Sequence, residues 1–198
     1  AVTRARGQVA ALIGAGAEEI VFTGCATEAN NLALLGAAQA AAPGKRHLVI
    51  SAVEHPAVMA PAQHLQARGW ALTIVPVDGD GRVSVDAVAA ALRAETVLVS
   101  VMHANNEVGT LQPVAGIAAL TRPRGILLHT DAAQSAGKVA LDVDALGVDL
   151  LTLAGHKFHA PKGVGALYVR EGTPIAPVLY GGGQERGLRP GTENVAAI

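Results

Sequence analysis

Lys157 is the residue whose type and place best suit covalent chemistry. It is one of only four lysines among 198 residues, and it lies in Gly155-His156-Lys157, directly after the apolar stretch 150–153. A lysine amine in a partly desolvated pocket has a lowered pKa and becomes a nucleophile. The alternative is a solvated lysine in a surface loop. Because Lys157 directly follows a stretch typical of a buried strand, we predict a pocket lysine.

Asp131 is a carboxylate that follows a second apolar stretch, residues 126–129. An unpaired charge in such surroundings is costly, so Asp131 requires a cationic partner. The sequence leaves two candidates open, an arginine of this chain or a bound ligand. Gln134 lies three residues further along and adds an amide to the same region.

An anion-binding turn is predicted in residues 23–30, Thr-Gly-Cys-Ala-Thr-Glu-Ala-Asn. The pattern indicates the end of a strand, a tight turn and the start of a helix. Free backbone N–H groups at a helix N-terminus bind anions, and Thr27 could add its hydroxyl group. An ordinary helix cap is the alternative interpretation. The turn lacks lysine, which excludes a Walker-type phosphate loop.

Two more polar groups follow predicted strands. Glu54-His55-Pro56 comes after the apolar stretch 47–51, and Asn105-Asn106-Glu107 comes after 96–101. A histidine at a strand end can cap a helix, bind a metal or stack on a ring. Tandem asparagines are usually part of a turn, through hydrogen bonds to their own backbone.

These groups share one chemical interpretation, a site for pyridoxal 5′-phosphate. The helix N-terminus would bind the phosphate, and His55 would stack on the pyridine ring. Asp131 would keep the ring nitrogen protonated, which makes the ring an electron sink. Lys157 would form the Schiff base.

The elements that must position these residues alternate between strands and helices. Helices are predicted over 27–36, 56–68 and 84–93 and from Pro113 onward. Apolar strands are predicted over 19–23, 47–51, 72–77, 96–101, 125–129, 150–153 and 165–169. This order indicates a three-layer α/β/α domain with a mostly parallel sheet, in which ligands bind at the carboxyl ends of the strands. The last two strands have no helix between them, so one is expected to run antiparallel and to make the sheet mixed.

Composition narrows the class of protein. Hydrophobic residues make up 51% and charged residues 16%, which excludes a disordered segment. A net charge of −1 argues against nucleic acids and anionic membranes as partners. No apolar run reaches the ~18 residues of a membrane span, and the N-terminus has no signal-peptide layout, so we expect a cytoplasmic protein. The single cysteine excludes an intramolecular disulfide and a cysteine-rich zinc cluster.

Two other kinds of site are weakly supported. None of the seven histidines forms an HExxH pair, so no metal site is predicted. A serine hydrolase is also disfavoured, because the GxSxG elbow is missing.

The sequence resembles the cysteine desulfurases of the class V aminotransferase group, and most closely the NifS-like type. The resemblance extends over all 198 residues. It is carried by segments in a fixed order: FTGCATEANN (22–31), EH (54–55), MHANNEVG (102–109), HTDAAQ (129–134), GHKFHAPKG (155–163), GGGQER (181–186) and RPGTEN (189–194). By this resemblance the chain would have the fold of the large domain of an aspartate aminotransferase-like, pyridoxal phosphate-dependent transferase.

The resemblance implies roles at the phosphate end of the cofactor. Ala26 and Thr27 would bind the phosphate, and His156 would flank it. Thr192 would reach the phosphate of a neighbouring subunit, which implies a homodimer with shared active sites.

It also implies roles around the cofactor ring. His55 would stack on the ring, and Asn106 would contact the side of the ring that carries the phenolic oxygen. Gln134 would donate to that oxygen, and Asp131 would pair with the pyridinium. Lys157 would carry the cofactor and move protons as acid and base.

The implied activity is removal of sulfur from L-cysteine, giving alanine and an enzyme persulfide. The sulfur would pass to an acceptor or scaffold protein for iron–sulfur cluster assembly or other sulfur delivery. Selenocysteine lyase, another class V aminotransferase activity and an inert fragment are the alternatives.

The sequence departs from the family pattern in length and at two positions. Residues 1–198 would be the large domain, truncated at both ends and without the C-terminal small domain that carries the catalytic cysteine, so the chain alone is expected to be inactive. Cys25 replaces a glycine of the phosphate turn, which would strain the turn if φ were positive there. Ala154 replaces a serine whose hydroxyl group would bind the phosphate.

Overall fold

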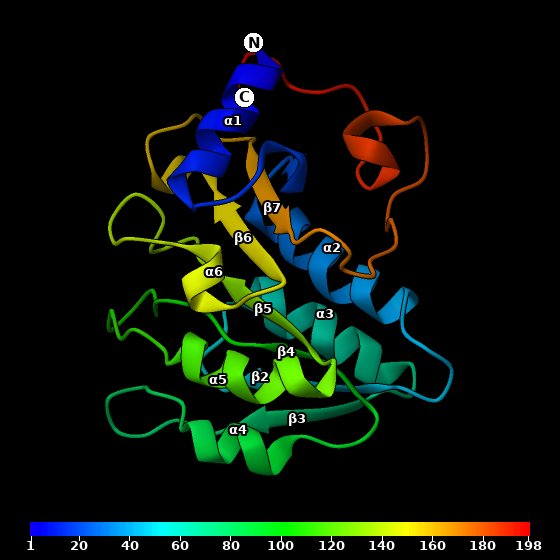
Figure 1. Cartoon of the computed structure of the whole chain (residues 1–198), viewed down its shortest axis with the longest axis vertical. Coiled ribbons are helices and arrows are strands. Elements are labelled where there is room, and N and C mark those ends of the chain that lie inside the picture. Colours follow the sequence, from blue (N-terminus) through cyan, green and yellow to red (C-terminus); the bar gives the residue numbers. More distant parts are fainter.

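A seven-stranded mixed sheet forms the centre of the molecule, which we describe over residues 1–198 from a computed structural model (Figure 1). The strand order is β1-β7-β6-β5-β4-β2-β3. Five strands run parallel from β6 to β3, and β7 pairs antiparallel with both β6 and β1. The strands are β1 (Ile20–Thr23), β2 (His47–Ser51), β3 (Ala71–Val75), β4 (Thr96–Ser100), β5 (Leu127–Asp131), β6 (Leu150–Ala154) and β7 (Gly165–Val169).

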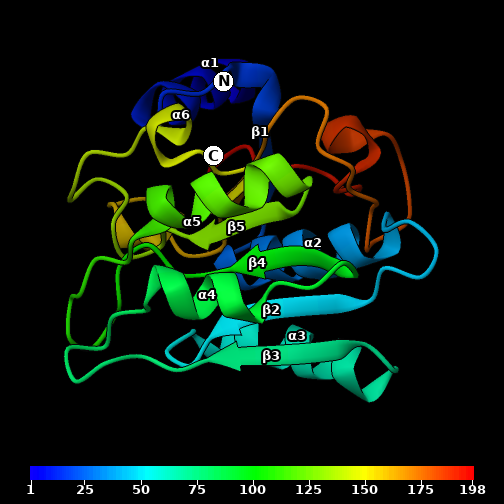
Figure 2. The same cartoon turned by 60° about the horizontal axis from the view of Figure 1, so that its bottom comes forward.

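Helices cover both faces of this sheet, so its strands are apolar on both sides. In β2, Leu48 and Ile50 pack toward α2 and α3, while Val49 packs into the core on the other face. Figure 2 shows α4 and α5 in front of the strands and α2 and α3 behind them. The helices are α1 (Val2–Leu12), α2 (Ala26–Gln39), α3 (Pro56–Ala67), α4 (Val85–Ala91), α5 (Val114–Thr121) and α6 (Val143–Leu146). None of them has both the length and the apolar character needed to cross a bilayer.

Short 3₁₀ turns complete the chain. They are Ala17–Glu19, Arg122–Arg124, Gly155–Lys157 and Gln184–Gly187. The third of them directly follows β6 and carries the predicted pocket lysine.

The predicted strands and the mixed sheet are confirmed, with one shift in position. The strand predicted over 125–129 is observed at Leu127–Asp131. Gly125 adopts a left-handed conformation (φ 61°) that ends the preceding turn, and the Ile126 amide still bonds to Thr121 O, so the strand begins two residues later. Asp131 is therefore the last residue of β5 and does not follow it.

Local sequence signals explain several helix starts. Pro56 is the first residue of α3, where its missing N–H costs nothing. Ser84 caps α4 by accepting a hydrogen bond from the Ala87 amide. Asp142 caps α6 in the same way, and this four-residue helix is an element that the sequence pattern did not predict.

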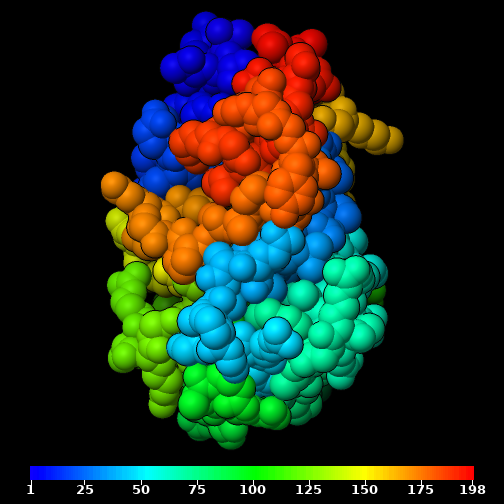
Figure 3. Space-filling model, turned by 90° about the vertical axis from the view of Figure 1, so that its right-hand side faces the viewer, coloured from blue at the N-terminus to red at the C-terminus, as the bar shows by residue number.

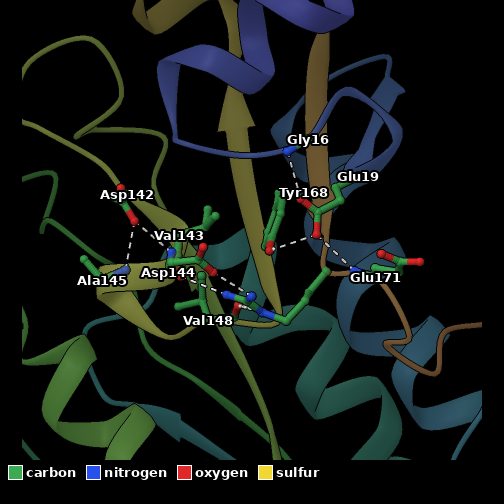
Figure 4. Close-up of polar contacts among 10 residues, drawn as sticks. Gly16, Glu19, Asp142, Val143, Asp144, Ala145, Val148, Tyr168 and Glu171 are labelled. Atoms are coloured by element: carbon green, nitrogen blue, oxygen red, sulfur yellow. Dashed lines mark hydrogen bonds and ion pairs between the residues drawn. The ribbon is translucent and has the colours of Figure 1, made fainter.

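Arg170 joins the end of β7 to α6. Its Nη1 lies 2.7 Å from Asp144 Oδ1, and its guanidinium also donates to the carbonyl groups of Val143 and Val148. Nearby, Glu19 accepts from the Tyr168 hydroxyl group and the Glu171 amide, which connects the start of β1 to the end of β7 (Figure 4).

The segment after β7 runs across one side of the molecule, next to the surface of α2 (Figure 3). The Ala176 amide donates to Gly36 O, and a Cβ added at Gly36 would lie 2.5 Å from Ala176 O. Glycine is thus required at this point of α2, because any side chain would push the segment away.

Glu185 in this segment seals the free edge of β1. It is only 6% exposed, and its Oε2 accepts from the Phe22 amide at 2.7 Å. Arg6 donates two hydrogen bonds of 2.7 and 2.6 Å to the same carboxylate and a third to Ile20 O. Edge strands have unpaired amides and carbonyls, and here the side chains of Arg6, Glu185 and Arg186 bond to them.

We expect Glu185→Gln to lower the free energy of unfolding by about 2–3 kcal/mol, because it leaves Arg6 without its counter-charge in a mostly buried pair. Urea unfolding at neutral pH measures this loss. Glu171→Gln is the matched control, since the Glu171 side chain is exposed, and it should change stability by less than about 0.5 kcal/mol. Equal losses in the two variants would show that the contacts of Glu185 with Arg6 and Phe22, which we call the Glu185 clamp, contribute nothing to stability.

Candidate active site

A cavity of about 240 Å³ opens at the edge of the sheet where the parallel strands end. Its walls come from segments that follow β1, β2, β4, β5 and β6, which are far apart in the sequence. The cavity brings together eight of the nine predicted site residues, namely Ala26, Thr27, His55, Asn106, Asp131, Gln134, His156 and Lys157.

Thr192 is the predicted residue that lies elsewhere. It lines a separate hollow together with Arg189 and Glu193. The resemblance assigns Thr192 to the site of a neighbouring subunit, so its place outside the cavity of its own chain agrees with that prediction without testing it.

The N-terminus of α2 forms one end of the cavity. No side chain caps this helix, and the one acidic residue of its first turn, Glu28, accepts instead from Gly24 N at 2.8 Å and from Arg189 at 2.6 Å. The first amides of α2 therefore meet no carboxylate of this chain, and a bound anion can accept from them. Thr27 is exposed beside them.

The phosphate turn itself is unstrained. Cys25 has φ −175°, which is extended backbone, so the strain considered for a cysteine at this position does not arise. The turn packs directly against Gly165 of β7. A Cβ at this position would lie 2.6 Å from Cys25 C and 2.8 Å from Ala26 N, so any other residue would push the turn away. Cys25 and Ala154 also line the cavity.

Asp131 is buried in the cavity wall without a cationic side chain. Its Oδ2 accepts from Asn30 Nδ2 at 2.7 Å, and its Oδ1 accepts from Ala133 N at 2.9 Å. The ion pairs of the structure involve Arg6, Arg170 and Arg189, and none of them reaches Asp131. This excludes the first of the two partners considered, an arginine of this chain, and a bound ligand stays a prediction.

Burial raises the pKa of Asp131 above its ordinary value, because the charged form loses its hydration. The hydrogen bonds from Ala133 and Asn30 and the charge of His55 act in the opposite direction. A cation bound next to Asp131 would add to that opposing effect and favour the carboxylate.

His55 projects from the start of α3. Its Nδ1 accepts from the Ala57 amide at 3.1 Å, so the ring caps the helix. This bond fixes the orientation of the ring. The ring is exposed and lines the cavity, where one face can contact a flat ligand.

The two tandem asparagines have different tasks. Asn105 is buried, and its Oδ1 accepts from the amides of Glu107 and Val108, which builds the turn. Asn106 lines the cavity.

Gln134 lines the same cavity. Its Oε1 accepts a hydrogen bond from Lys138 Nζ at 3.2 Å, so its Nε2 is left to donate to a ligand.

Lys157 lies on the turn Gly155–Lys157 and lines the cavity, but its side chain is exposed. The expected partial desolvation is therefore wrong for this chain. The turn lifts Lys157 off the end of β6, and no segment of the chain covers it. Its ammonium group makes no hydrogen bond or ion pair within the chain.

Asn30, which lines the cavity, and His129, which is buried on β5, make contacts that the sequence did not reveal. Asn30 is fully buried on α2, and its amide carbonyl Oδ1 has no partner. His129 lies two residues before Asp131 on β5, between Ser100 Oγ at 2.8 Å and Thr152 Oγ1 at 3.1 Å. Burial lowers the pKa of His129 to about 3, so the ring is neutral. No local signal marks either residue, because Asn30 is followed by a second polar residue, Asn31, and His129 is followed by Thr130.

Comparisons with a family model and with known proteins point to the same family. The family model for class V aminotransferases matches residues 1–198. The cysteine desulfurase IscS of Dictyoglomus turgidum is 48% identical over 198 residues, which are all of this chain and 50% of that protein. The cysteine desulfurase of Trichormus azollae is 49% identical over the same 198 residues, which are 49% of that protein. The chain thus spans about half the length of the curated relatives that it matches.

Solved structures agree in fold. A structure described as a NifS-like protein superposes with a TM-score of 0.95 at 42% identity, over 99% of this chain and 54% of that one. SspA in complex with cysteine superposes with a TM-score of 0.93 at 40% identity, over 99% of this chain and 57% of that one. The predicted fold class and the resemblance to NifS-like cysteine desulfurases are confirmed. Since the family model matches every residue, this chain belongs to the class V aminotransferase family.

Proposed function

We propose that this chain is the cofactor-binding large domain of a pyridoxal phosphate-dependent cysteine desulfurase. The observation that carries the proposal is the buried carboxylate of Asp131, which has no cationic partner and lies in one cavity with an amine and a helix N-terminus. The names of the relatives and of the SspA–cysteine structure support L-cysteine as the substrate.

The residues present fit the cofactor group by group. The free amides of α2 and the hydroxyl group of Thr27 suit the phosphate, with His156 on the adjacent turn. Asp131 suits a protonated ring nitrogen, because that cation supplies the charge which the protein lacks. Gln134 has a free amide donor for the phenolic oxygen, and Lys157 has a free amine.

Pyridoxal phosphate supplies an electron sink that stabilises negative charge at the substrate Cα. The chain supplies the rest of the site. Asp131 holds the proton on the ring nitrogen, and Asn30 fixes the direction of that carboxylate. Lys157 Nζ would hold the cofactor covalently and would accept and donate protons as base and acid. His55 would cover one face of the ring and exclude water from it.

Transfer of sulfur requires a thiolate at the substrate sulfur. Cys25 is the only cysteine, and it lies at the helix N-terminus, at the phosphate end of the cavity. We propose that another segment of the full-length enzyme supplies the thiolate. The full-length enzyme would act as a cytoplasmic homodimer, to which Thr192 contributes across the interface, and would pass sulfur to an acceptor or scaffold protein.

Lys157→Ala should abolish covalent attachment of pyridoxal phosphate, because no other amine lines the cavity. The measurement is borohydride reduction of the chain with pyridoxal phosphate, followed by mass spectrometry of its peptides. Lys162→Ala is the matched control from the same loop and should keep the label. A label that persists on the Lys157→Ala protein at wild-type yield would contradict the assignment.

Asp131→Asn should weaken binding of pyridoxal phosphate roughly tenfold, about 1.4 kcal/mol, because the ring nitrogen loses its counter-charge. The free protein should be at least as stable as the wild type, since an uncompensated buried carboxylate is removed. Asn30 can flip and offer its unpartnered Oδ1 to the new amide. Titration with the cofactor and thermal unfolding without it measure the two effects. A stability loss with unchanged affinity would mean that Asp131 has only a structural task.

The 198-residue chain should not turn over cysteine even when it is loaded with pyridoxal phosphate, because no thiolate lies where the sulfur leaves. The test supplies cofactor and cysteine and measures alanine and sulfide, for the wild type and for Cys25→Ser. Sustained alanine formation that disappears in Cys25→Ser would contradict the proposal and make Cys25 the sulfur acceptor.

A further inference from the structure

Glu54 is a buried carboxyl group without a task in the function proposed above. It is 8% exposed and lies between the end of β2 and the start of α3. Its Oε1 accepts two hydrogen bonds, from Ser51 Oγ at 2.5 Å and from the Met102 amide at 2.8 Å. Its Oε2 is buried and has no partner.

These two bonds tie together the segments that carry two residues of the cavity. Ser51 ends β2, and His55 directly follows Glu54. Met102 lies just beyond the end of β4, at the start of the segment that leads to Asn106. One carboxyl oxygen therefore links the neighbouring strand ends β2 and β4 and sets where the His55 and Asn106 segments leave the sheet.

The groups around Glu54 do not support a negative charge. Asp131 on β5 repels it, and the ring of His103 beside β4 is neutral because burial lowers the pKa of that histidine. The hollow on its outer side is lined by Asp78, Asp80 and Glu107, and neither lysine nor arginine is among the lining residues. His55 is the one basic residue among those lining this hollow, and it is exposed.

Burial raises the pKa of Glu54 to about 8, although the bonds from Ser51 and Met102 act in the opposite direction. At neutral pH the group is therefore a carboxylic acid. Because Oε1 accepts two bonds, the acid proton lies on Oε2.

We propose that Glu54 is a positioning residue which, as an uncharged acid, holds the His55 and Asn106 segments against the cavity. Its effect on cofactor binding rests on the proposed function, whereas its effect on the free protein does not. Ionisation places a carboxylate in a buried site that already faces Asp131, so loss of the proton loosens both segments.

The direction in which stability changes with pH follows from the protonation of Glu54 in the unfolded and folded chain. In the unfolded chain Glu54 titrates near its ordinary value of 4.5, and in the folded chain near 8. Between these values the folded state holds one more proton than the unfolded state, so stability falls as pH rises. Above about pH 8 both states are ionised, and the contribution no longer changes. Glutamine imitates the protonated acid and has no such dependence.

The first test measures urea unfolding of the free wild-type chain, Glu54→Gln and the exposed-site control Glu171→Gln from pH 5 to pH 9. The stability of Glu54→Gln relative to the wild type should rise steadily from pH 5 to pH 8 and then level off, while the control stays parallel to the wild type. Parallel curves for Glu54→Gln and the wild type would overturn the proposal.

The second test measures affinity for pyridoxal phosphate at pH 7 and pH 9. The wild type should lose about tenfold more affinity over this range than Glu54→Gln, because one pH unit above the pKa leaves about a tenth of the protein in the competent form. Ser51→Ala, which keeps the carboxyl group but removes one of its ties, should bind more weakly than the wild type at both values. Equal pH dependence in the wild type and Glu54→Gln would overturn the positioning task. A wild type that does not bind at pH 7 would refute the proposed function instead, and the unfolding test would still decide the case of Glu54.

Discussion

The burial of the Asp131 carboxylate without a cationic side chain is the constraint on which the site depends. Such a group stays ionised only if hydrogen bonds and a positive charge compensate it, and otherwise burial favours its protonated form. Asn30 and the Ala133 amide supply the hydrogen bonds, and both partners are set by the packing of α2 on the sheet and by the end of β5. A ligand that brings its own cation, as the protonated pyridine ring of the proposed cofactor does, would supply the missing positive charge.

The fold supplies the other groups through its strand order. Because β2, β4, β5 and β6 are parallel, their carboxyl ends meet at one edge, and residues up to about 130 positions apart line one cavity. The antiparallel β7 has a different task, since Gly165 allows the phosphate turn to pack directly on the sheet. On the outside of the molecule, the Glu185 clamp bonds to β1, and the segment that crosses α2 bonds to that helix through the Ala176 amide. The stability of the site is thus set partly by contacts far from the cavity.

The sequence predicted the strands and eight of the cavity residues because both depend on local signals, apolar runs and the polar residues that follow them. It could not predict features that depend on distant pairs. The partner of Asp131 is Asn30, 101 residues away, and Glu185 reaches Phe22 across 163 residues. The exposure of Lys157 was mispredicted because an apolar strand says nothing about what covers the turn after it. Glu54 was noticed only as the neighbour of His55, since its bond to the Met102 amide joins residues 48 positions apart.

The most direct test of this account is a crystal structure of the chain with pyridoxal phosphate. The account predicts the phosphate at the first amides of α2, the ring nitrogen within hydrogen-bonding distance of Asp131, and a covalent bond to Lys157 Nζ. A cofactor bound with its phosphate elsewhere, or with its ring nitrogen turned away from Asp131, would contradict it.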